Sequence, residues 1–168
     1  MSNGDDVVVK EGDCICGSCN SNGRMFWISG LYGKVRCERD NLGCKLDGEG
    51  SRQVMLVDGT GGGTLVLRGL HILRGNSVFG GGMNANSNAM VTLELVLFEN
   101  CHASSEVYGG GAIMGWSGDL NLFGVSFLGN TAASNQGYDI YVNTGSSSVT
   151  FHNTCPVGEG GSPTEGES

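Results

Sequence analysis

The sequence predicts an all-β chain: a single-stranded right-handed parallel β-helix of about four to five coils, with three short strands per coil. Two phrases return after 29 residues, since the glycine triplet 80–82 recurs at 109–111 and the apolar segment 120–122 recurs at 149–151. The segment 65–70 also matches 120–125, a separation of about two such periods. A fixed period of this size is typical of repeat architectures, in which each copy is one unit of a solenoid.

Each repeat contains short segments in which apolar and polar residues alternate. The expected strands are 55–57, 65–67, 70–72, 83–85, 91–93, 95–97, 112–114, 120–122, 125–127, 139–142 and 149–151. Such alternation buries one row of side chains and exposes the other. Three strands per repeat form a triangular coil, with glycine and asparagine at the corners because both tolerate left-handed backbone conformations.

An asparagine follows these strands once in each repeat. The four residues are Asn76, Asn100, Asn130 and Asn153. Stacked coils place equivalent side chains about 4.8 Å apart, so we expect a structural ladder of amide hydrogen bonds. The alternative is four unrelated turn asparagines.

The composition agrees with a narrow solenoid core and excludes several other classes. Glycine accounts for 31 of 168 residues, but it does not recur at every third position as in collagen. A disordered chain would be more charged than 15% and less apolar than 39%. No apolar run approaches the roughly 20 residues that a membrane-spanning helix needs.

Three regions follow from these patterns. We expect residues 1–30 to form an amino-terminal cap and first partial coil, and residues 31–157 to form the β-helix. Residues 158–168 contain only Gly, Ser, Glu, Thr and Pro and are expected to be a disordered tail or linker. The start shows no signal peptide, which was either removed or never present. Nothing obvious caps the end after Phe151, which predicts further coils or end-to-end association.

The charge balance limits the partners. A net charge of −8 and a pI near 4.7 argue against nucleic acid and against anionic membranes, because both attract clustered Lys and Arg. Acidic polysaccharides would also be repelled unless a cation bridged them.

The cysteines predict disulfides near the amino terminus. The candidates are Cys14, Cys16, Cys19, Cys37 and Cys44. Cys37 and Cys44 bracket a short loop and are plausible partners. Cys101 and Cys155 lie two copies apart, about 9.6 Å, which is too far for a disulfide, so they are expected to be free thiols. A thiolate metal site is the alternative for the first cluster, but its odd number and poor spacing favour no metal.

The chemistry-bearing residues do not converge on a catalytic centre. The acidic residues of the coils are Asp58, Glu94, Glu99, Glu106, Asp119 and Asp139, and they fall at different points of the repeat. His71, His102 and His152 are similarly dispersed, so we expect no catalytic residue and no cofactor. Trp27, Trp116 and Tyr141 could be aromatic platforms for sugar rings or simply packing residues.

Several segments resemble a known β-helix group. Residues 44–48, 54–59 and 65–70 look like the opening coils of pectin-lyase-like right-handed parallel β-helix proteins. The segment Gly110-Gly111-Ala112-Ile113, followed by Phe127-Leu128-Gly129-Asn130, is similar to the GGAI and FxxN motifs of the chlamydial polymorphic outer-membrane protein repeats. The resemblance spans about residues 30–153. It implies the β-helix fold and relatives that are adhesins, surface proteins, or polysaccharide lyases, hydrolases and epimerases.

We therefore expect a non-catalytic extracellular or cell-surface module. It would bind a glycan or a protein, serve in adhesion, or self-associate through its coil ends, without nucleic-acid binding or membrane insertion. The main alternative is a carbohydrate-active enzyme (polysaccharide lyase, hydrolase or epimerase) or a degenerate remnant of one. A third possibility is an intracellular assembly protein with free thiols.

Overall fold

The computed structural model describes residues 5–10, 12–15, 24–29, 33–39, 41–60, 62–133, 137–143 and 147–153. These residues form strands β1 to β19 and no helix. The described part of the chain accordingly contains no helix long and apolar enough to cross a membrane.

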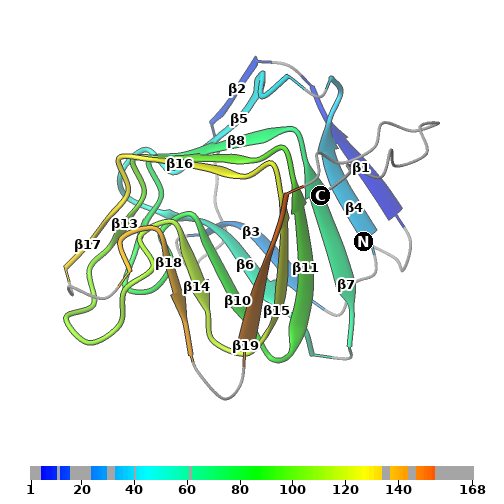
Figure 1. Cartoon of the computed structure of the whole chain (residues 1–168). Coiled ribbons are helices and arrows are strands. Elements are labelled where there is room, and N and C mark those ends of the chain that lie inside the picture. Colours follow the sequence, from blue (N-terminus) through cyan, green and yellow to red (C-terminus); the bar gives the residue numbers. More distant parts are fainter. Residues whose placement is uncertain are drawn as a thin grey trace.

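The strands wind into an all-β parallel solenoid of about four turns (Figure 1). Sheet A contains β1 (Asp5–Val9), β4 (Gly33–Cys37), β7 (Thr64–Arg68), β11 (Ala89–Glu94), β15 (Gly118–Phe123) and β19 (Ser147–His152). Sheet B contains β2 (Gly12–Ile15), β5 (Cys44–Asp47), β8 (Leu70–Leu73), β12 (Leu97–Glu99) and β16 (Ser126–Leu128). Sheet C contains β3 (Arg24–Ser29), β6 (Gln53–Asp58), β10 (Met83–Asn86), β14 (Ile113–Gly115) and β18 (Ile140–Val142).

A fourth, short sheet adds a side that the three-strand prediction did not include. Sheet D contains β9 (Asn76–Ser77), β13 (His102–Ala103) and β17 (Thr131–Ala132). It forms where each coil passes from sheet B to sheet C. Two strands of sheet B also begin later than expected, because Leu95 and Gly124 adopt positive φ and turn the chain before β12 and β16.

The repeat period is confirmed by the strand register. Leu65, Val91 and Leu120 occupy equivalent positions on adjacent coils, so segments 65–70 and 120–125 are two turns apart, as predicted. Val149 continues the same row. The first three of these side chains are buried, because alternate residues of each strand point into the column.

The glycine triplets are explained by close backbone approach. Gly80 and Gly110 both have positive φ. A Cβ at either position would lie 2.2 Å from a carbonyl oxygen, that of Met83 or that of Ile113. Only glycine satisfies both the left-handed conformation and this contact, so the triplet marks the tight entry into sheet C.

The asparagine ladder is a wrong prediction. In sheet D, Asn76 lies opposite His102, and His102 lies opposite Thr131. Asn100 instead occupies a left-handed corner after β12, while Asn153 follows β19 in sheet A. The asparagines at the corner between sheets B and D therefore do not stack, because Asn76, Asn100 and Asn130 lie three, one and two residues after the paired strand ends Leu73, Glu99 and Leu128.

Asn130 has a separate structural role at one corner. This buried residue accepts a hydrogen bond from Cys101 N at 2.9 Å through Oδ1. Its Nδ2 donates to Phe98 O at 3.2 Å and to Asp139 Oδ1 at 3.0 Å. The asparagine of the FxxN motif thus ties its own coil to the backbone of the preceding one.

The amino-terminal region is built into the solenoid. Its strands β1, β2 and β3 pair in parallel with β4, β5 and β6, so the described part of residues 1–30 contributes one strand to each large sheet. The predicted tail, residues 158–168, lies outside the described residues.

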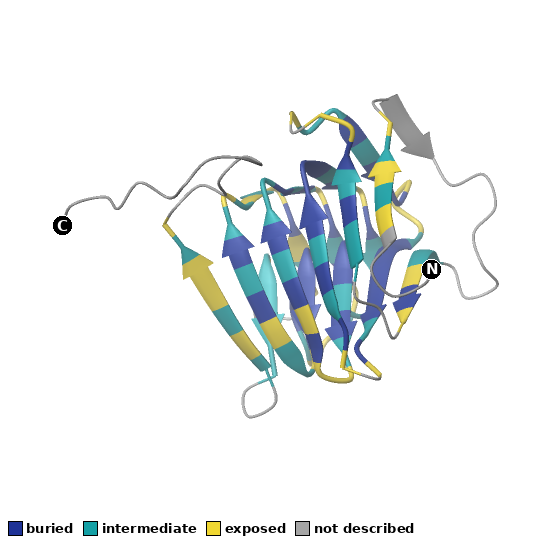
Figure 2. Cartoon of the chain, turned by 90° about the vertical axis from the view of Figure 1, so that its right-hand side faces the viewer, coloured by how far each residue is buried: buried dark blue, intermediate teal, exposed yellow. Residues whose placement is uncertain are grey.

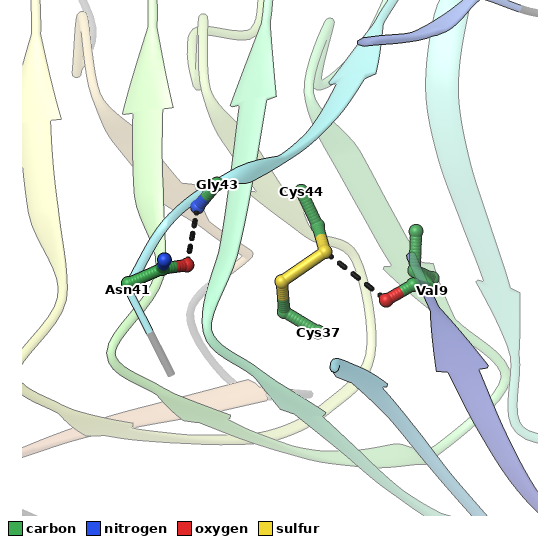
Figure 3. The surroundings of a disulfide bond; sticks show 5 residues. All are labelled: Val9, Cys37, Asn41, Gly43 and Cys44. Carbon is green, nitrogen blue, oxygen red and sulfur yellow. Dashed lines mark hydrogen bonds between the residues drawn. A yellow bond between two sulfur atoms is a disulfide. The ribbon is translucent and has the colours of Figure 1, made fainter. Parts of the chain in front are cut away.

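The predicted disulfide between Cys37 and Cys44 is present (Figure 3). The two Cα atoms are 5.5 Å apart, and both residues are buried. The connecting loop is shaped by Asn41, whose Oδ1 accepts a hydrogen bond from Gly43 N at 2.9 Å. Cys44 Sγ lies 3.1 Å from the carbonyl oxygen of Val9 in β1 (Figure 3). The disulfide therefore closes the corner between sheets A and B beside the first described strand.

Burial falls at the carboxyl-terminal coil. Figure 2 shows sheet A with buried residues in its central strands and none in β19 at its edge. Leu67, Leu93 and Leu122 are at most 2% exposed, but Phe151, which continues this row, is 66% exposed. The reason is that no further described strand pairs with β19.

Candidate functional site

The outer side of sheet C carries a row of large side chains. Strand pairing places Trp27, Leu56, Asn84, Met114 and Tyr141 at equivalent positions on the five strands. Their neighbours along the strands face the core, so this row faces away from it. Trp116 directly follows β14 and stands two residues after Met114, so it faces the same outer side. Its amide donates to Ala85 O at 2.8 Å.

Four aromatic rings cluster on this side of the molecule. Tyr108 is at the centre, with ring centroids 5.1 Å from Trp116, 5.8 Å from Tyr141 and 5.9 Å from Phe79. The Phe79 and Trp116 centroids are 6.2 Å apart. These separations and the edge-on angles of 62° to 84° around Tyr108 are typical of favourable aromatic contacts. We call Phe79, Tyr108, Trp116 and Tyr141 the aromatic cluster.

A pocket of about 500 Å³ adjoins the aromatic cluster. Its lining residues are Arg24, Ser51, Gln53, Asn76, Ser77, Val78, Phe79 and Asn84. Phe79 belongs to both features, so the pocket and the cluster form one continuous face. We call this the sheet C face.

The polar lining of the pocket is held by hydrogen bonds. Buried Gln53 donates through Nε2 to the carbonyl oxygens of Phe79 at 2.7 Å and Gly80 at 2.9 Å. Gln53 Oε1 accepts a hydrogen bond from Arg24 Nε at 3.0 Å. Because Gln53 is anchored to the backbone, the Arg24 guanidinium is held at the start of sheet C.

Two side-chain amide oxygens of β10 lack a hydrogen-bond donor. Among the described residues, Asn84 Oδ1 and Asn86 Oδ1 are buried side-chain acceptors without a hydrogen-bond partner. An unpaired buried acceptor costs about 1–3 kcal/mol of stability.

Of the three aromatic residues singled out from the sequence, Trp116 and Tyr141 belong to the aromatic cluster and Trp27 does not. Trp116 and Tyr141 both contact Tyr108, whereas Trp27 lies on β3, four strand spacings or about 19 Å from Tyr141. Trp116 is 39% exposed and Trp27 is 53% exposed.

Sequence reasoning missed Phe79, Tyr108, Arg24 and Gln53. A signal for the first two was present, because each directly precedes a glycine triplet and they are 29 residues apart. No repeat pattern marks Arg24 or Gln53. Their association appears only when β3 and β6 pair in register.

A second group of polar residues lies on sheet B. Arg74 binds both carboxylate oxygens of Asp47, with Nε at 3.0 Å from Oδ1, and His71 Nε2 lies 2.7 Å from Glu99 Oε2. Burial raises the pKa of Asp47, but hydrogen bonds from Arg74 and from the Glu49 amide outweigh this and hold the pKa below its usual value. The carboxylates of Asp47 and Glu99 are thus both paired with neighbouring side chains.

The remaining acidic residues are distributed over several surfaces. Glu94 pairs with Arg68 on sheet A at 2.9 Å, Asp119 Oδ1 accepts a hydrogen bond from Ser148, and Asp139 accepts one from Asn130. Hydrogen bonds from Thr60 lower the pKa of Asp58 at the end of β6. Within the described ranges, no group of three or more His, Cys, Asp or Glu residues could hold a metal ion.

The other histidines make separate contacts. His102 Nδ1 lies 2.8 Å from Thr131 Oγ1 on sheet D. His152 lies 3.2 Å from Asn121 Oδ1 and stacks on Phe123 with ring centroids 3.9 Å apart.

Cys101 is a free, buried thiol. Burial raises its pKa to about 12. Cys16, Cys19 and Cys155 lie outside the described residues, and only the backbone of Cys14 is described.

No family model, curated protein or solved structure matches this chain. The functional argument therefore depends on the sheet C face itself.

Proposed function

We propose that this chain is a non-catalytic extracellular or cell-surface β-solenoid module that binds a glycan on its sheet C face. The observation that carries the proposal is the aromatic cluster, in which Tyr108 packs against three rings while Trp116 remains 39% exposed. Aromatic rings present flat apolar surfaces with polar edges, which suits the two-sided character of a sugar ring.

The surroundings of the cluster support a polyhydroxylated ligand. The residues that line the adjoining pocket include Ser51, Ser77, Asn76 and Asn84. Such groups donate and accept hydrogen bonds, as sugar hydroxyls do. Concave sites that combine apolar walls with a few polar groups are typical of small-ligand binding.

A surface or extracellular location belongs to the same proposal. Disulfides persist in oxidising compartments, and the Cys37–Cys44 bond closes a corner of the solenoid. The GGAI and FxxN similarities support placement among the pectin-lyase-like β-helices with repeats of the chlamydial polymorphic outer-membrane type. Ala112, Ile113 and Asn130 of these motifs are buried, so the similarity supports the fold more directly than the ligand.

A glycan array tests the proposal. We expect the wild-type protein to bind at least one oligosaccharide, with affinity then measured by calorimetry. Trp116→Ala is expected to weaken that binding about tenfold or more. Phe123→Ala is the matched control, since it removes an aromatic ring from the outer side of sheet A and should leave binding unchanged.

Three results would contradict the proposal. Binding that Trp116→Ala and Phe123→Ala weaken equally would rule out the aromatic cluster as the binding site. No glycan binding at all would favour a protein partner or self-association. Product release from a polysaccharide in reducing-sugar and lyase assays would make the chain an enzyme.

A further inference from the structure

We propose that the pocket at the Arg24 end of the sheet C face binds the anionic group of an acidic sugar, a carboxylate or a sulfate ester, within an otherwise largely neutral glycan. This inference rests on the proposed function and specifies its ligand class.

Arg24 differs from the other described arginines whose partners are known. Arg36, Arg52, Arg68 and Arg74 each pair with a carboxylate, those of Asp6, Glu49, Glu94 and Asp47. Within the described ranges, the partner of Arg24 is the neutral amide of Gln53. A guanidinium has five N–H donors, and the contact with Gln53 uses the one on Nε.

The Arg24 charge is held in place and partly removed from water. Gln53, which accepts the Nε hydrogen bond, is itself buried and fixed by the carbonyl oxygens of Phe79 and Gly80. A partly buried cation without an opposite charge is unfavourable, and a bound anion would remove that cost. Guanidinium groups form strong, directional hydrogen bonds with carboxylate and sulfate oxygens.

The charges around the pocket favour an anion at this end of the face. Among the described residues that line the pocket, Arg24 is the one that carries a charge. Glu49 lies near the Ser51 turn but is paired with Arg52 at 2.5 Å. Asp58 lies at the opposite end of β6, five residues or about 17 Å from Gln53.

The net charge of the chain determines how many acidic groups the glycan can carry. At −8, the protein as a whole repels a polyanion over distances of about one Debye length, roughly 8 Å at physiological salt. A single acidic sugar placed against Arg24 avoids most of this repulsion. Neutral sugars would then extend from Phe79 along the aromatic cluster.

NMR titration tests the pocket with monosaccharides. The probes are glucuronate, glucose 6-sulfate and glucose, added to protein with ¹⁵N-labelled arginine. We expect the Arg24 Nε–H signal to shift with the two acidic sugars and not with glucose, while the Arg36 signal stays in place. The stronger of the two acidic probes identifies the preferred anionic group.

Two substitutions separate the charge from the fold. Arg24→Gln is expected to reduce affinity for the preferred acidic probe about tenfold, to the level of glucose. Arg36→Gln removes the same charge from the outer side of sheet A and should preserve the preference. Raising the salt concentration should weaken the acidic probes more than glucose.

The outcomes distinguish this inference from the proposed function. Equal binding of glucose and both acidic sugars, or a preference that survives Arg24→Gln, would overturn the pocket assignment and leave glycan binding by the aromatic cluster intact. Loss of oligosaccharide binding in Trp116→Ala tests the cluster independently. Tighter binding of a polyuronate than of a neutral chain with one acidic sugar would refute the inference that the bound glycan carries few acidic groups.

Discussion

The row of leucines along sheet A allows a direct test of the stacked register. Leu93 lies between Leu67 and Leu122 on adjacent coils and is fully buried. Phe151 occupies the equivalent position on β19, but 66% of it is exposed. Replacing each residue by alanine therefore compares the same row position in the middle and at the end of the solenoid.

The expected costs differ although phenylalanine is the larger side chain. Leu93→Ala removes buried methyl groups and leaves a cavity, because the paired strands on both sides hold the backbone in place. Such changes typically cost about 2.7–5.0 kcal/mol. Only about a third of Phe151 is removed from water, so Phe151→Ala should cost about 1 kcal/mol or less.

Urea unfolding followed by circular dichroism measures both values. In thermal unfolding, each kcal/mol corresponds to a decrease in Tm of about 2–4 °C for a chain of this size, so Leu93→Ala should lower Tm by about 10 °C. A loss for Phe151→Ala as large as that for Leu93→Ala would refute the register or the exposure of the last coil.

Three further predictions concern the cysteines and one ion pair. Replacing Cys37 and Cys44 together by alanine should lower the free energy of unfolding by about 2.5 kcal/mol, because the disulfide closes a loop of eight residues and so reduces the entropy of the unfolded chain. An unchanged free energy of unfolding in chemical denaturation would contradict this prediction. Cys101, with its thiol pKa raised to about 12, should resist alkylation at pH 8 in the folded protein and react after unfolding, as peptide mapping would show. The lowered pKa of Asp47 means that its contribution to stability is present above about pH 4 and is lost as the pH falls through the folded pKa. Arg74→Gln should therefore flatten the stability profile between pH 5 and 3, and an unchanged slope would argue against the ion pair.

Much of the fold was accessible from the sequence because a solenoid repeats locally. The recurrence of 120–122 at 149–151 predicted strand pairing that the register confirms residue by residue. Short sequence separation also made the Cys37–Cys44 pairing predictable. The asparagine ladder failed because Asn76 and Asn130 take different positions at corners of equal length, so Asn76 lies level with Thr131 and not with Asn130.

The candidate site was only partly accessible. Trp116 and Tyr141 were identified by residue type, and the aromatic residue before each glycine triplet was a repeat signal that could have added Phe79 and Tyr108. Arg24 and Gln53 carried no such signal, because their pairing depends on how two strands 29 residues apart are aligned.

By itself, the sequence determined the period, the parallel stacking and the identity of the core rows, because alternation and glycine placement act over a few residues. The tertiary structure decided the fourth sheet, the level of each corner residue, and the placement of Arg24 in a pocket that shares Phe79 with the aromatic cluster. These depend on how strands of successive coils are aligned, because a shift of one residue in the register moves a side chain to another level or another face.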